Sequence, residues 1–142
     1  MLKHVTQLTI WLLCCFSLCI FTLGISWKLS TFINFGYQQF YSVLSIDKTI
    51  EKYALLNRFD RKDFVETKMQ QHVDLFQDIV WSINNSGKGL AEITYRNNSN
   101  KEKRLLTNAE VLHLKDVSIL VDDLRKLWFV NIIPLIIFFF YF

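Results

Sequence analysis

Two long stretches without a charged residue bound this chain and constrain its fold more than any other feature. The first runs from Val5 to Trp27 and the second from Leu127 to Phe142. Between them lie all 13 acidic residues and, apart from Lys3, all of the 16 basic ones. Apolar ends around a charged middle are typical of membrane segments that flank a water-exposed domain. The sequence therefore predicts a mainly α-helical membrane protein.

The first apolar stretch predicts a transmembrane helix after a short cytoplasmic N-terminus, which together occupy residues 1–27. A helix from Val5 to Trp27 would extend about 34 Å, enough to cross a hydrocarbon core of about 30 Å. Trp11 and Trp27 fall near the ends of this helix, where indole rings favour the membrane interface.

The few charges around this helix favour a cytoplasmic N-terminus. Lys3 precedes the helix, and the positive-inside rule then places the following domain outside the cytoplasm, although Lys28 follows the helix directly. A cleaved signal peptide is the alternative interpretation, with Gly24-Ile25-Ser26 as a small-residue cleavage site. Because the apolar region is longer than a typical signal core, an uncleaved anchor is favoured.

Residues 28–126 form the predicted extracytoplasmic domain, a small α+β unit of helices and one hairpin. Apolar spacing predicts a helix from Tyr37 to about Ile46 and a short helix over 48–57. Asp60, as an N-cap, begins a predicted amphipathic helix that ends at the turn residues 84–87. Strand-forming residues on either side of a polar loop predict a hairpin over 89–107.

His72 falls near the middle of the apolar half of that amphipathic helix. A histidine there is usually a core residue whose hydrogen bonds are satisfied. The alternative is that His72 lines a pocket and takes part in chemistry.

Composition and spacing argue against several classes of function. The net charge of +3 is spread without a basic stripe, so we expect no nucleic-acid partner. Cys14, Cys15 and Cys19 all lie inside the first apolar stretch, so we expect no disulfide to the middle domain. The chain has no Gly-rich phosphate loop and no metal-ligand spacing, so we expect neither a cofactor nor a metal.

A predicted helix over 107–126 carries the strongest candidates for chemistry. Thr107 and Glu110 fit a capping box, which begins the helix. His113 falls within the apolar arc of the helical wheel, and Asp116 lies three residues on at the edge of that arc. A carboxylate beside an imidazole can fix its tautomer and stabilise the imidazolium, as a general base requires. The alternative is a histidine that only packs and hydrogen-bonds.

The stretch Ala-Glu-Val-Leu-His-Leu-Lys-Asp-Val-Ser, residues 109–118, resembles a motif of the bacterial lipoprotein intramolecular transacylases. That motif is Arg-Glu-Ile-x-His-Met-x-Asp-Val-Lys. Glu110, His113, Asp116 and Val117 match it, whereas the arginine and the final lysine are replaced. The order of anchor, small extracytoplasmic domain, motif and second span is also similar. The resemblance implies an enzyme that moves an acyl chain from a lipoprotein's diacylglycerol to its N-terminal cysteine amine, giving the lyso-form.

The resemblance also implies roles for single residues. His113 would be the general base, and Asp116 or Glu110 would orient it. Family members supply a second functional histidine from a later loop, after two further spans, and nothing in the motif gives His72 that role.

The last apolar stretch, residues 127–142, predicts a second transmembrane helix. It would extend only about 24 Å, which falls short of the hydrocarbon core. We therefore expect the helix to be incomplete, in a shortened or partial family member that is inactive alone.

These expectations place the protein in a bacterial cell membrane as a multi-pass protein, with the lipid bilayer and diacylated lipoproteins as partners. A non-enzymatic alternative is a small membrane-anchored protein whose exported domain binds a membrane or envelope partner. A third alternative is a secreted binding domain released by signal cleavage.

Overall fold

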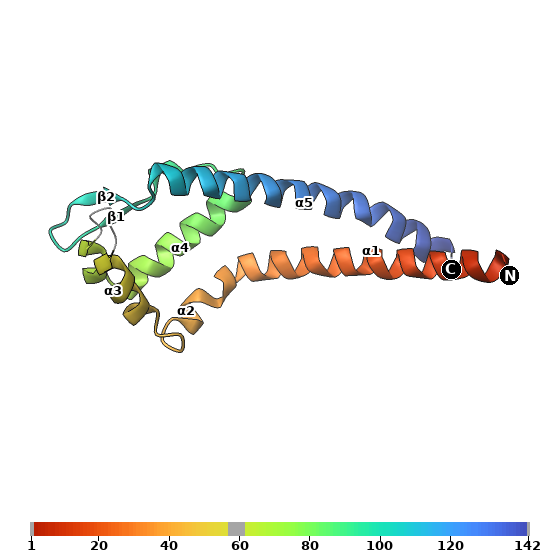
Figure 1. Ribbon diagram of the computed structural model, residues 1–142, viewed down its shortest axis with the longest axis horizontal. Helices are drawn as coiled ribbons and strands as arrows, with labels where there is room; N and C mark the ends of the chain where they lie inside the picture. Colours follow the sequence, from red (N-terminus) through yellow and green to blue (C-terminus); the bar gives the residue numbers. More distant parts are fainter. Residues whose placement is uncertain (1, 57–61, 142) are drawn as a thin grey trace.

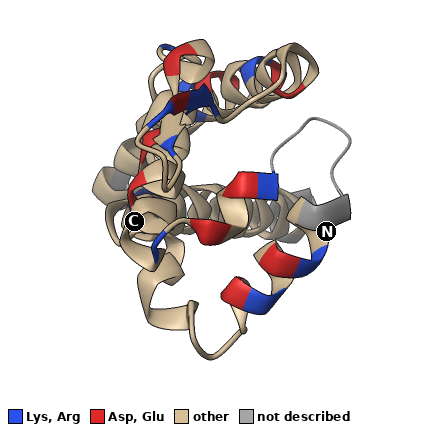
Figure 2. Ribbon diagram, turned by 90° about the vertical axis from the view of Figure 1, so that its left-hand side faces the viewer, with Lys and Arg blue, Asp and Glu red and all other residues tan. Residues whose placement is uncertain are grey.

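The computed structural model describes residues 2–56 and 62–141. Its longest elements are two helices, α1 (Leu2–Phe32) and α5 (Asn108–Tyr141), which run antiparallel and side by side with the two chain ends at the same end (Figure 1). The remaining elements lie at the opposite end and, with the first half of α5, form what we call the head. Acidic and basic residues gather on the elements of the head (Figure 2).

Short helices and one hairpin build the head. In chain order they are η1 (Asn34–Gly36), α2 (Tyr37–Phe40), α3 (Ile46–Leu56), η2 (Lys62–Glu66), α4 (Met69–Asn84), η3 (Leu90–Glu92), β1 (Thr94–Arg96) and β2 (Glu102–Arg104). The two strands are antiparallel, with Tyr95 opposite Lys103. The expected mainly helical fold with one small hairpin is therefore confirmed for the described residues.

The core of the head forms where α4 and the hairpin meet the start of α5. Its buried apolar residues are Leu75, Leu90, Ile93, Tyr95 and Val111. Tyr95 is anchored at its polar end, because its hydroxyl donates to Asp63 Oδ1 at 2.8 Å. The core thus holds the hairpin, η2, α4 and the start of α5 together.

The helix expected from Tyr37 to about Ile46 is wrong in its second half. α2 ends at Phe40, residues 41–45 form turns, and α3 begins at Ile46. Ser45 has a positive φ of 48°, which a helix does not allow. The buried Tyr41 side chain bonds to His72 of α4, and this long-range contact accompanies the break. The helix expected over 48–57 corresponds to α3, with Asn57 outside the described residues.

The long amphipathic helix expected from Asp60 is also interrupted. Asp60 itself lies outside the described residues, and η2 is a 3₁₀ turn that ends at Glu66. Lys68 is extended, with φ −79° and ψ 151°, so α4 begins only at Met69. Thr67 lies at this break, and its hydroxyl donates to the Phe64 carbonyl oxygen at 2.6 Å. A side chain that bonds its own backbone in this way competes with helix continuation.

One helix of the described chain, Val5–Phe32 within α1, is long and apolar enough to cross a membrane. Most of its apolar side chains have no protein cover; Phe16 is 66% exposed and Leu23 65% exposed. Exposed patches this continuous are rare on water-soluble monomers. An anchor helix near the N-terminus is therefore supported by its length, composition and exposure.

Close approach of two residues fixes the contact between α1 and α5. A Cβ atom on Gly24 would lie 2.0 Å from Trp128 Cδ1, so only glycine fits there. Trp128 also donates from Nε1 to the Phe21 carbonyl oxygen at 3.0 Å, and its ring stacks on Phe21. Small residues allow such close helix contacts in membranes.

Candidate functional site

The start of α5 confirms the expected capping box. The Thr107 backbone N–H donates to Glu110 Oε2 at 2.7 Å, and the Glu110 N–H donates to Thr107 Oγ1 at 3.2 Å. These bonds satisfy donors that the first turn of a helix leaves free. The Glu110 carboxylate therefore serves the helix cap.

His113 and Asp116 lie on the exposed side of α5. The side that packs on the head runs instead through Val111, Ser118 and Val121, all of which are buried. His113 has no hydrogen bond or ion pair in the described part of the chain, and the same holds for Asp116. The side of α5 that packs on the head is thus a different side from the one that carries His113 and Asp116.

An uncovered row of leucines continues from this pair toward the apolar end of α5. Leu120, Leu124 and Leu127 are each at least half exposed, at 59%, 54% and 50%. Asp116, Leu120 and Leu124 follow one another at four-residue spacing, which places them on one face of the helix. We call Leu120, Leu124 and Leu127 the leucine ridge.

His72 lies in the core of the head, only 5% exposed, with both ring nitrogens bonded. Tyr41 Oη lies 2.7 Å from Nδ1, and Thr67 Oγ1 lies 2.5 Å from Nε2. Because the Thr67 hydroxyl proton is already donated to Phe64, Thr67 accepts from Nε2–H. Nδ1 then accepts from the Tyr41 hydroxyl, which assigns the neutral Nε2–H tautomer.

The environment of His72 favours its neutral form. Burial lowers the pKa of His72 below its usual value, and a hydrogen bond with the Phe64 backbone opposes that effect only in part. His72 contacts side chains of the turn after α2, of η2 and of the η2–α4 connection, whereas His113 stands exposed on α5. The structure therefore gives the two histidines separate surroundings and no mutual contact.

A cleft that the sequence did not reveal opens where α4 meets the α1–α5 pair. Its volume is about 890 Å³. The lining residues include Leu23, Trp27, Lys28, Thr31, Asn34, Gln77, Trp81, Asn84, Leu124, Arg125 and Trp128. One feature of the sequence could have indicated it: an aromatic residue and a cation lie together at the inner end of each apolar stretch, Trp27 with Lys28 and Trp128 with Arg125.

Hydrogen bonds to the end of α4 hold the rim of this cleft. Arg125 Nη2 donates to the Asn84 carbonyl oxygen at 2.7 Å, and its Nη1 lies 3.2 Å from Asp122 Oδ1. Trp27 Nε1 donates to Asn84 Oδ1 at 3.1 Å. A guanidinium on the last carbonyls of a helix satisfies acceptors that the helix leaves free. Both long helices are thereby joined to α4 at one level.

Comparisons with protein-family models, with curated proteins and with solved structures find no match for this chain. Among the described residues, no group of three or more His, Cys, Asp or Glu side chains could hold a metal ion. The candidates for function among the described residues are therefore His113 with Asp116, the leucine ridge and the cleft.

Proposed function

We propose that the protein takes part in acyl transfer on diacylated lipoproteins at the membrane surface, with His113 as general base. One observation carries the proposal. The exposed pair of His113 and Asp116 lies at the head end of the leucine ridge, which leads along α5 toward its apolar half. An acylated substrate can rest its chains on the ridge while its polar end reaches His113.

The proposal includes a second membrane segment in the C-terminal half of α5. This half packs along α1, and its outward side chains, such as Ile137 and Phe140, are exposed. Trp27 and Lys28 on α1 lie level with Arg125 and Trp128 on α5, because all four line one cleft. Aromatic and cationic side chains at one depth are typical of a membrane interface. The head then stands outside the cytoplasm, as the positive-inside rule favours.

The proposed reaction moves one acyl group within a single lipoprotein molecule. His113 takes a proton from the N-terminal amine, whose nitrogen attacks the ester carbonyl carbon. The bond from that carbon to the glycerol oxygen breaks, an amide bond forms, and the imidazolium returns the proton to the glycerol oxygen. Asp116 is three residues from His113, within reach on a helix surface, and its carboxylate stabilises the imidazolium.

Lipopeptide analysis of a lipoprotein from expressing cells tests this role. The samples are wild type, His113→Ala and the control Lys115→Ala, a change at an exposed position of the same helix. Each is expressed alone and together with the later spans of a family member, because the resemblance assigns a second histidine to those spans. We expect lyso-form product only with the later spans present, in wild type and the control. Absence of lyso-form from every sample contradicts the proposal.

A non-enzymatic role is the second candidate. It is favoured by the lack of any hydrogen-bond partner for His113 among the described residues. In that case the leucine ridge binds a membrane or envelope partner, and His113 is one surface residue among others. Charged substitutions at Leu120 and Leu124 then abolish partner binding, whereas His113→Ala leaves it unchanged.

A further inference from the structure

The lining of the cleft between α1, α4 and α5 has an unbalanced charge. Two cations, Lys28 and Arg125, line it, and none of the described lining residues is acidic. Lys28 has no ion pair within the described chain. Apolar and aromatic side chains, among them Trp81, cover much of the remaining wall. A hollow with apolar walls, an unpaired lysine and an arginine whose only ion-pair partner lies outside the lining suits an amphiphile with an anionic group.

Arg125 keeps donors for such a group. Its guanidinium carries five N–H donors, and the bonds to Asn84 and Asp122 leave others unused. Those two bonds also hold the guanidinium in place at the rim. Arginine held in this way binds phosphate oxygens with favourable geometry.

Asn34 places an unsatisfied hydrogen-bond acceptor at the cleft. Its side-chain Oδ1 is buried and has no hydrogen-bond partner among the described residues, although Asn34 lines the cleft. Leaving a buried acceptor unsatisfied costs about 1–3 kcal/mol. Asn34 and Phe35 both have positive φ values, 51° and 52°. Left-handed backbone is strained for a bulky residue such as Phe35, and strain of this kind is often found at binding sites.

We propose that this cleft binds one anionic phospholipid from the leaflet next to the head. The phosphate lies between Lys28 and Arg125, an acyl chain lies along the apolar wall formed by Ile20 and Leu23, and a headgroup hydroxyl donates to Asn34. Phosphatidylglycerol has each of these groups. The lipid reaches the cleft from the bilayer in which α1 lies.

A lipoprotein substrate explains the cleft less well. The diacylglycerol of a lipoprotein is joined to cysteine and carries no phosphate, so it leaves Lys28 without an anion and the unused donors of Arg125 without an acceptor. The lipid site therefore depends on the proposed membrane placement but not on acyl transfer. His113 lies outside the lining, so His113→Ala leaves lipid binding unchanged.

Tryptophan fluorescence measures the proposed binding, because Trp27, Trp81 and Trp128 line the cleft. The full chain is reconstituted in phosphatidylcholine vesicles that contain a small fraction of either brominated phosphatidylglycerol or brominated phosphatidylcholine. Bromine atoms on acyl chains quench nearby indoles. We expect stronger quenching by the brominated phosphatidylglycerol at equal content. Equal quenching by the two lipids overturns the proposal.

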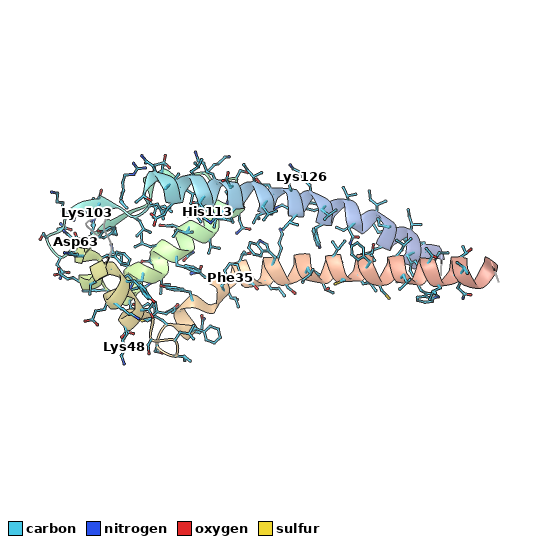
Figure 3. The ribbon with its side chains drawn as sticks, in the orientation of Figure 1. Phe35, Lys48, Asp63, Lys103, His113 and Lys126 are labelled. Atoms are coloured by element: carbon cyan, nitrogen blue, oxygen red, sulfur yellow. The ribbon has the colours of Figure 1, made fainter. Side chains whose placement is uncertain are left out.

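Variants separate a built site from general surface charge. Lys28→Gln removes a cation that lines the cleft and should weaken the preference for phosphatidylglycerol about tenfold or more, the effect expected for one hydrogen bond to a charged group. The control is Lys126→Gln, which removes an exposed cation of α5 that pairs with Asp123 and does not line the cleft (Figure 3). Equal losses in the two variants would show non-specific attraction and overturn the site.

Asn34→Asp is an independent test. It keeps the shape of the side chain and places a negative charge in the cleft. Aspartate also tolerates the positive φ at this position. The variant should therefore fold and lose the preference for the anionic lipid, while an undiminished preference would contradict the assigned position of the headgroup.

Discussion

Ser17 of α1 and Asn131 of α5 exchange two hydrogen bonds across the helix pair. Ser17 Oγ donates to Asn131 Oδ1 at 2.8 Å, and Asn131 Nδ2 donates to the Ser17 carbonyl oxygen at 2.8 Å. Both residues are buried, at 9% and 7% exposure. The bonds hold the two helices together, and under the proposed membrane placement no water is present to replace either partner.

Replacing Asn131 with leucine removes both bonds. We expect the helix pair to lose about 1 kcal/mol of unfolding free energy, the size found for hydrogen bonds between membrane helices. Ser17→Ala should cost less, because the backbone oxygen of residue 17 still accepts from Asn131. Unfolding by increasing sodium dodecyl sulfate measures both changes, with the exposed Val130→Ala as control. Stability of Asn131→Leu equal to that of wild type would contradict this role.

Gly24→Ala should disrupt the same helix pair by steric overlap. Its new methyl group would collide with the Trp128 ring, and overpacking of this kind costs about 1–3 kcal/mol. Cross-linking of a cysteine pair placed across the two helices should become less efficient. In a Trp128→Ala background, the further effect of Gly24→Ala should be small. An equal loss in both backgrounds would show that the contact is not the cause.

The ionised carboxylate of Asp63 stabilises the head, so protonation of Asp63 should make the head less stable in acid. Burial alone would raise the pKa of Asp63, but hydrogen bonds from Lys103, Tyr95 and Asn97 outweigh it and lower the pKa to about 2 (Figure 3). A lowered carboxyl pKa stabilises the fold above the unfolded value of about 4, and this contribution is lost as the pH falls toward 2.

Asp63→Asn measures that contribution. We expect a loss of about 1–2 kcal/mol at neutral pH that shrinks in acid. Asp123→Asn is the matched control, since its ion pair with Lys126 is largely exposed and worth little. Thermal unfolding at neutral and acidic pH compares the variants. A loss in Asp63→Asn that stays constant with pH would contradict the assignment.

His72 should titrate below the usual range. Because burial lowers its pKa in the folded protein, the fold favours neutral His72, and stability declines as the pH falls below about 6.5. His72→Ala should cost about 2–3 kcal/mol, since it leaves Tyr41 and Thr67 without their partner. NMR titration of the imidazole gives the pKa, and a value above 6.5 would contradict the stabilisation of neutral His72 by burial.

Features set by local sequence were predictable. The capping box of Thr107 and Glu110 and the range of α3 depend on neighbours within one or two turns. The break between η2 and α4 was not predicted, because the apolar spacing continues across it, whereas the bonds of the Thr67 hydroxyl to Phe64 and His72 depend on a side-chain conformation that such spacing does not specify. Likewise, the exposure of His113 depends on which face of α5 packs on α4 and the hairpin. A helical wheel shows one helix alone and cannot say which of its faces another element covers. The cleft joins residues that are about a hundred positions apart, such as Lys28 and Arg125.

The N-terminal lipopeptide of a diacylated lipoprotein provides the most direct measurement. Acyl transfer within one molecule leaves the mass unchanged, so tandem mass spectra must show whether the acyl group is on the cysteine nitrogen or on glycerol. With the later spans of a family member supplied, wild type should give N-acylated peptide, and His113→Ala should reduce its rate of formation by about a hundredfold or more. Equal amounts of N-acylated peptide from wild type and His113→Ala would contradict the role of His113 as general base.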